Sequence, residues 1–207
     1  MRSFTSLFAA LLIATIFVLS GGNASAHVVT CDFTTGGGWI LIPSGTASGS
    51  LGLPESGEKA NFGIVGGCKN GGFYGHANYV DHNNGLHVNG PVTGYLDPCI
   101  GECGLRPGYR DLCGPAKTNQ GFDVYFRIRT KDNGEPGGDD RFGIKLVRQS
   151  NTADVVYLVP TRELGPPGTT GGGGNIQFHK PNPSNTGPNP PPDEFTACHM
   201  DDSGLGE

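Results

Sequence analysis

The segment between residues 132 and 140 holds a dense set of potential metal ligands. It reads DNGEPGGDD, so carboxylate and amide oxygens lie close together on a glycine-rich stretch. Hard oxygen ligands on a bent loop are what Ca²⁺ prefers. The spacing is not that of an EF-hand, and Asp and Asn also hydrogen-bond within turns, so a solvated hairpin loop is the alternative and the preferred interpretation. The candidate calcium ligands are Asp132, Asn133, Glu135, Asp139 and Asp140.

A second group of potential ligands consists of His76, Asp81 and His82. Two histidines with a carboxylate can bind Zn²⁺ or Cu²⁺, and such a centre would make the chain a metal-dependent secreted enzyme. A regular strand would place both histidines on one face and Asp81 on the other, unless a turn has already begun. Hydrogen bonding at the end of a strand is the simpler interpretation. The chain has no G-x-S-x-G motif to frame a nucleophile, so we assign no catalytic residue.

The N-terminus has the three parts of a cleaved secretory signal peptide. Arg2 supplies a positive charge, residues 7–19 are almost entirely apolar, and Ala24-Ser25-Ala26 has the small-x-small pattern of a cleavage site. We therefore expect a signal peptide at residues 1–26 and a mature chain that begins at His27. The apolar run is shorter than the roughly 20 residues that cross a bilayer. The mature chain is thus expected to be secreted, extracellular or at the cell surface, with no transmembrane segment.

The six cysteines all follow the expected cleavage site. An even number in an oxidising compartment is typical of disulfides, although the sequence does not select their pairing. The spacings lack the paired C-x2-C motifs of zinc sites, which argues against a metal cluster. Either the C-terminal tail folds back and is joined to the domain through its cysteine, as the even count favours, or that cysteine pairs elsewhere. The predicted disulfide cysteines are Cys31, Cys68, Cys99, Cys103, Cys113 and Cys198.

Alternating apolar and polar residues predict the strands that would position these groups. In residues 122–130, FDVYFRIRT, every second side chain from Phe122 to Ile128 is apolar, and residues 141–147, RFGIKLV, repeat the pattern. The Asn-Gly and Pro-Gly pairs between them indicate a hairpin. With the other short apolar segments, the pattern predicts an all-β fold over residues 27–180. It would be a single antiparallel β-sandwich or barrel-like domain of about eight strands, with glycine-rich turns and disulfide bonds.

The only tryptophan, Trp39, precedes the apolar run Ile40-Leu41-Ile42. Large aromatic side chains dominate small β cores, so the favoured interpretation is that Trp39 belongs to the first core strand. The alternative is an exposed indole that stacks on the face of a sugar.

The composition changes after Lys180. The following PNPSNTGPNPPPDE is rich in proline, which donates no backbone hydrogen bond. We therefore expect residues 181–207 to form an extended, semi-rigid Pro/Asn/Gly-rich C-terminal tail.

The formal charge of −5 comes from 19 acidic and 14 basic residues. Because the basic residues do not form a stripe, nucleic acid is not an expected partner. The expected partners are cell-surface components or a polysaccharide, and Ca²⁺ is the one cofactor that the sequence suggests.

Four short segments resemble a known family. They are TGGGWI at residues 35–40, GHANYVDHNNGLHVNG at 75–90, DNGEPGGDDRF at 132–142 and GGGGNIQFHK at 171–180. Together they resemble the exported bacterial β-domain of the post-COAP type, over about residues 31–180. The resemblance implies an extracellular β-domain but no reaction, because the biochemical role of that family is uncharacterised. This chain departs from the pattern in its cysteine-rich insertion around residues 99–113 and in its extension after Lys180.

The sequence thus predicts a secreted, non-enzymatic module with a structural or binding role. A Ca²⁺-dependent or carbohydrate-binding module is the first alternative, and a metal-dependent secreted enzyme is the second.

Overall fold

The computed structural model describes residues 32–52, 58–96, 108–135, 139–164 and 172–206. The predicted signal peptide and Cys31, Cys99 and Cys103 lie outside these ranges. The described chain forms ten strands and one short helix, α1 (Glu194–Cys198). The strands are β1 (Phe33–Ile42), β2 (Glu58–Lys69), β3 (Gly72–Asp81), β4 (Leu86–Pro91), β5 (Gly94–Leu96), β6 (Tyr109–Thr118), β7 (Asp123–Lys131), β8 (Arg141–Arg148), β9 (Asn151–Glu163) and β10 (Gly172–His179).

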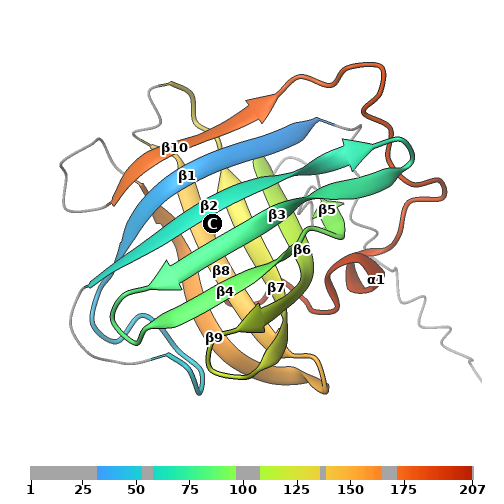
Figure 1. The fold of residues 1–207 in the computed structure, drawn as a ribbon. Coiled ribbons are helices and arrows are strands. Elements are labelled where there is room, and N and C mark those ends of the chain that lie inside the picture. The colour runs from blue at the N-terminus through green and yellow to red at the C-terminus, as the bar shows by residue number, and fades with distance from the viewer. Residues whose placement is uncertain (1–31, 53–57, 97–107, 136–138, 165–171, 207) are drawn as a thin grey trace, which may run out of the picture.

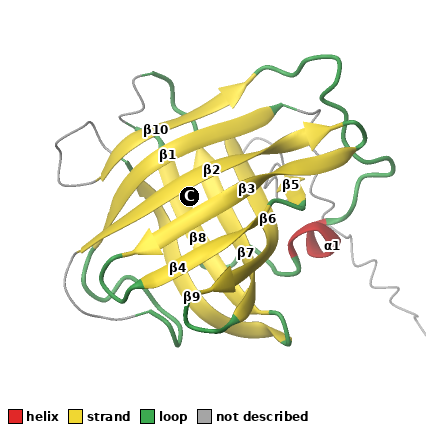
Figure 2. Ribbon diagram, viewed as in Figure 1, coloured by secondary structure: helices red, strands yellow, loops and turns green. Residues whose placement is uncertain are grey.

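All the strands belong to one antiparallel sheet in the order β10-β1-β2-β3-β4-β6-β7-β8-β9, with β5 paired to β6. The sheet curls into a half-barrel, so that β1–β4 and β10 face β6–β9 (Figure 1). Colouring by secondary structure shows how small the helical part is (Figure 2). The predicted all-β, single antiparallel barrel-like fold is confirmed, with ten strands in place of about eight.

The inner face of the curled sheet carries the main hydrophobic core. Phe62 of β2 stacks on Phe142 of β8 with 4.1 Å between ring centroids. The hydroxyl oxygens of Tyr79 on β3 and Tyr157 on β9 lie 2.8 Å apart. Each pair joins strands from opposite halves of the half-barrel, so side chains fill its interior. The alternation predicted for β7 and β8 is confirmed, because Val124, Phe126, Ile128, Ile144 and Leu146 are all buried in this core.

The expectation that Trp39 lies in the core is wrong. Strand alternation turns Ile40 and Ile42 inward, and the indole lies half-buried on the outer face of β1. It covers Gly173 of β10, where an added Cβ would lie only 2.7 Å from the indole Nε1. The apolar run after Trp39 therefore predicted the strand correctly, but it did not predict on which face of the sheet the indole lies.

The free edge of β9 is covered by the connection between β1 and β2. Ser48 and Leu158 exchange backbone hydrogen bonds of 3.0 and 2.9 Å, and the Leu51 amide donates to the Val156 carbonyl. Thr161 donates to the Leu205 carbonyl of the C-terminal tail. An edge covered in this way is a poor template for pairing with another chain.

The C-terminal tail folds back onto the sheet. Asn185 donates to the carbonyl of Cys68 at 2.8 Å, and α1 begins after the N-cap residue Asp193. A disulfide then joins Cys198 to Cys113 of β6, which confirms the predicted attachment of the tail to the domain. In the described ranges, no helix combines the length and the apolar character that crossing a membrane requires.

We expect the double substitution Cys113→Ser/Cys198→Ser to lower the free energy of unfolding by roughly 2–4 kcal/mol, because the bond closes a long loop. The two cysteines lie 85 residues apart. Chemical denaturation of the variant and the wild type measures the difference, and reducing agent should likewise lower the wild-type Tm. A wild-type melting curve that reducing agent leaves unchanged would contradict this expectation.

Candidate functional site

The acidic loop between β7 and β8 binds the edge of β10. The Asp140 side chain is buried, and its carboxylate accepts hydrogen bonds from the amides of Ile176 at 2.7 Å and Asn133 at 2.9 Å. Asp132 accepts from the amide of Phe178 at 2.8 Å. Because β10 ends the strand order, these two carboxylates satisfy amides on the outer edge of the sheet.

Asp140 also connects the two ends of the curled sheet. Its backbone carbonyl accepts a 2.7 Å hydrogen bond from Leu164, directly after β9, while its carboxylate binds Ile176 in β10. Burial raises the pKa of Asp140, and the amide donors partly oppose that shift. One residue therefore joins the first and last strands of the sheet order.

The other predicted calcium ligands also have partners or point to solvent. The side-chain amide of Asn133 donates to the Asp139 backbone carbonyl at 2.5 Å, and the Asn175 side chain donates to Glu135 at 3.1 Å. The Asp139 side chain is exposed. Across the described ranges, no three His, Cys, Asp or Glu side chains are grouped so that they could hold a metal ion. The loop carboxylates are thus brought together mainly as hydrogen-bond acceptors for backbone amides.

His76, Asp81 and His82 do not converge. Asp81 is buried and accepts a 2.7 Å hydrogen bond from the Tyr157 hydroxyl, inside the half-barrel. His82 is exposed and lies 2.7 Å from the side-chain oxygen of Asn61. His76 lies opposite Val65 on the outer face of the sheet. The strand alternation that the sequence predicted for these positions separates the carboxylate from the histidines.

A cluster of charged side chains lies beneath the end of the chain, which we call the C-terminal strap (residues 193–206). Asp111, Arg127 and Arg129 on the outer face of β6 and β7 are all fully buried. Arg127 donates to Asp111 at 2.6 Å, and Arg129 binds both oxygens of the same carboxylate at 2.9 Å. One carboxylate therefore serves two guanidinium groups, which leaves an excess positive charge.

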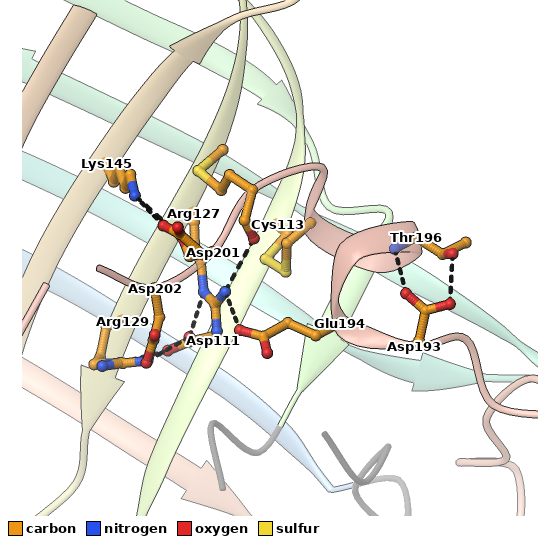
Figure 3. The surroundings of a disulfide bond; sticks show 12 residues. Asp111, Cys113, Arg127, Arg129, Lys145, Asp193, Glu194, Thr196, Asp201 and Asp202 are labelled. Carbon is orange, nitrogen blue, oxygen red and sulfur yellow. Dashed lines mark hydrogen bonds and ion pairs between the residues drawn. A yellow bond between two sulfur atoms is a disulfide. The ribbon is translucent and has the colours of Figure 1, made fainter. Parts of the chain in front are cut away.

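The strap supplies the missing negative charge (Figure 3). Glu194 forms an ion pair with Arg127, and Asp202 accepts from Arg129 at 2.8 Å. Lys145 of β8 donates to the Asp201 carboxylate at 2.5 Å. Buried charges are stable only when they are paired and hydrogen-bonded, so the strap is required by the strands that it covers.

Neighbouring groups favour the ionised forms of Arg127 and Asp201. Burial lowers the pKa of Arg127, but the charges of Asp111 and Glu194 raise it by more than burial lowers it. The net shift of the pKa is therefore upward. Hydrogen bonds from Lys145 and Ser203 lower the pKa of Asp201 from 3.8 to about 2. Arg127 and Asp201 are therefore charged near neutral pH.

Apolar contacts and the disulfide complete the attachment of the strap. Ala197 and Met200 pack with Leu96 and Val147 in a second hydrophobic cluster that also contains the disulfide. Of the other predicted disulfide cysteines, Cys68 is buried at the end of β2.

An open cleft lies on the outer surface beside the start of β7, where β4 pairs with β6. These strands pair through Val88 with Thr118 and through Asn89 with Lys117. The cleft contains a cavity of about 310 Å³. A second cavity of about 290 Å³ adjoins the first and shares two of its lining residues. The first is lined by Asn89, Pro91, Pro115, Ala116, Lys117, Asp123 and Gln149, and Asp123 and Gln149 are shared.

The sequence did not point to the charge cluster or the cleft. Arg127 and Arg129 fall on the polar side of an alternating strand, which normally faces water. The charge pattern of the sequence could have predicted the cluster, because the acidic residues around Glu194 and Asp201 complement the two arginines of β7. No comparable signal marks the cleft, because register brings its walls together.

No family model, curated protein or solved structure matches this chain.

We expect Asp140→Ala to lower the free energy of unfolding by about 2–4 kcal/mol, because the buried Ile176 amide and the part-buried Asn133 amide lose their acceptor. Chemical denaturation measures the loss. Asp139→Ala is the matched control, and its exposed side chain should change stability by less than about 0.5 kcal/mol. Equal effects of the two substitutions would rule out the role of Asp140 as an acceptor for the β10 edge.

Calcium binding by the same loop is the less favoured interpretation of its sequence, and a stability measurement tests it. Because the Asp132 and Asp140 carboxylates accept backbone amides, we expect Ca²⁺ added after EDTA treatment to leave the Tm unchanged. Thermal unfolding with and without Ca²⁺ tests this. A rise in Tm that Asp139→Ala abolishes would instead establish calcium ligation.

The contribution of Asp201 to stability should depend on pH. Its folded-state pKa of about 2 lies below the ordinary 3.8, so the stabilisation is present above pH 4 and is lost as the pH falls toward 2. The Tm difference between the wild type and Asp201→Asn should therefore shrink over that range. A difference that stays constant down to pH 2 would show that the carboxylate charge does not hold the strap.

Proposed function

We propose that this chain is exported and acts outside the cytoplasm or at the cell surface, as a non-enzymatic β module with a structural or binding role. The observation that carries the proposal is the Cys113–Cys198 disulfide, which fixes the strap over the buried charges. Disulfides persist in oxidising compartments and are rare in the cytosol. The signal-peptide pattern and the resemblance to exported β-domains support the same location.

The hydrogen bonding of the candidate residues supports a structural or binding role over a reaction. Asp81, Asp132 and Asp140 each accept hydrogen bonds that join separate parts of the sheet. Their carboxylates are thus used to hold the fold together. The outer face of β1–β4 and the cleft beside β4 are the surfaces that offer exposed side chains for recognition.

Expression with the native leader in a bacterium tests the export. We expect mass spectrometry of the secreted protein to give a chain that begins at His27, because the small residues Ala24 and Ala26 precede it. The matched control Ala24→Asp/Ala26→Asp should prevent cleavage. A wild-type chain that stays in the cytoplasm with residues 1–26 attached would overturn the proposal.

A further inference from the structure

The cleft over β4, β6 and the start of β7 is lined by side chains suited to hydroxyl groups. Asn89 and Gln149 carry amides, which donate and accept hydrogen bonds at once. Lys117 lies directly opposite Asp123 in the register of β6 and β7, so the charges in the cleft balance. Pro91 and Pro115 add apolar surface. The cavity of about 310 Å³ lies within the range of sites for small molecules.

A row of residues continues from this cleft across the outer face of the sheet. Asn89 lies opposite Asn78, which lies opposite Gly63 on β2. Gly63 faces Gly37 on β1, and Gly37 faces Asn175 on β10. From Asn175 to Lys117 the row crosses six strands, and at about 4.8 Å per strand spacing it spans about 24 Å. An extended chain of several sugar units fits that length, whereas a single small molecule would occupy only part of it.

The two glycines in the row are not needed for the fold. A Cβ at Gly63 would meet none of the described atoms within 4 Å, and one at Gly37 would meet only the Phe62 carbonyl, at 3.6 Å. Neither glycine has a positive φ. Glycine inside a strand costs about 0.5–1 kcal/mol relative to alanine, and it often marks a close approach by a ligand. Here the pair leaves bare backbone between Asn78 and Asn175.

The charge of the row selects the class of ligand. Carboxylates and phosphates are usually bound by arginine, and the row contains none. Its only cation, Lys117, is opposed by Asp123. Its other polar side chains are amides, of which Asn89 donates to Asn78 and Asn175 donates to Glu135 at 3.1 Å. The remaining donors and acceptors of Asn78 and Asn89 match uncharged hydroxyl groups. Trp39 lies beside the row on β1, with the Lys59 ammonium 4.1 Å from its ring centroid.

We propose that the cleft and the row from Lys117 to Asn175 bind a neutral, extended polysaccharide. The cleft holds one end of the bound segment, and the following sugars lie over the bare backbone of Gly63 and Gly37. The inference rests on the proposed binding role and names the class of ligand for it.

Titration calorimetry of the mature protein with soluble oligosaccharides tests the proposal. The panel contains linear β-1,4-glucan, β-1,3-glucan, xylan and mannan oligosaccharides, with polygalacturonate as the acidic counterpart. We expect one or more neutral members to bind, and Asn89→Ala to weaken that binding about tenfold through loss of an amide at the cleft. Failure of every neutral member to bind, or a preference for polygalacturonate, overturns the proposal.

A second variant separates blocked binding from damaged folding. Gly63→Val fills the row, and because valine favours strands the Tm should stay unchanged or rise while affinity falls at least about tenfold. Gly72→Val is the matched control, since its Cβ also has space and it lies six residues from Asn78 along β3. Equal affinity in the two valine variants refutes the row as the site. Correct export and processing without glycan binding would refute this inference alone and leave a structural role in place.

Discussion

Two buried guanidinium groups on β7 determine how the end of the chain is placed. Arg127 and Arg129 are fully buried, and Asp111 compensates only one of their two charges. An uncompensated charge out of water costs several kcal/mol, so the folded state requires Glu194 and Asp202 to lie over β7. The disulfide then limits how far the strap can move away. The proline-rich segment before the strap is therefore a connection between two parts of one packed structure.

The same constraint operates at the edges of the sheet, where backbone amides take the place of charges. A curled sheet that does not close leaves two edges, and unpaired amides at an edge invite other chains. Asp132 and Asp140 accept from β10, and the connection around Ser48 pairs with β9. The contacts with β10 come from the acidic loop whose sequence suggested calcium binding. Within the described ranges, Asn61, Asn78 and Asn89 are exposed on the outer face of β1–β4, which is why recognition is best sought there.

The proposed glycan site depends on strand register more than on any local motif. Gly37, Gly63, Asn78 and Asn89 are spread over four strands, and each is ordinary in its own segment. A shift of one residue in any pairing would move these side chains to the inner face. The inner side chains Ile64, Ala77 and Val88 are buried, so the hydrophobic core fixes the register that aligns the outer row. Packing inside the half-barrel thus organises its outer surface.

The strands were predictable from the sequence, because side chains alternate with a period of two whatever lies above them. The sequence also predicted the inward set of Phe126, Ile128 and Ile144, and it indicated that the cysteine beyond the proline-rich segment is joined to the domain. Alternation does not reveal what covers a face. The burial of Arg127 under the strap, the packing of Trp39 on Gly173 and the hydrogen bond from Tyr157 to Asp81 therefore follow from tertiary structure alone. In each case the deciding contact comes from a strand or strap distant in the chain, which local patterns cannot encode.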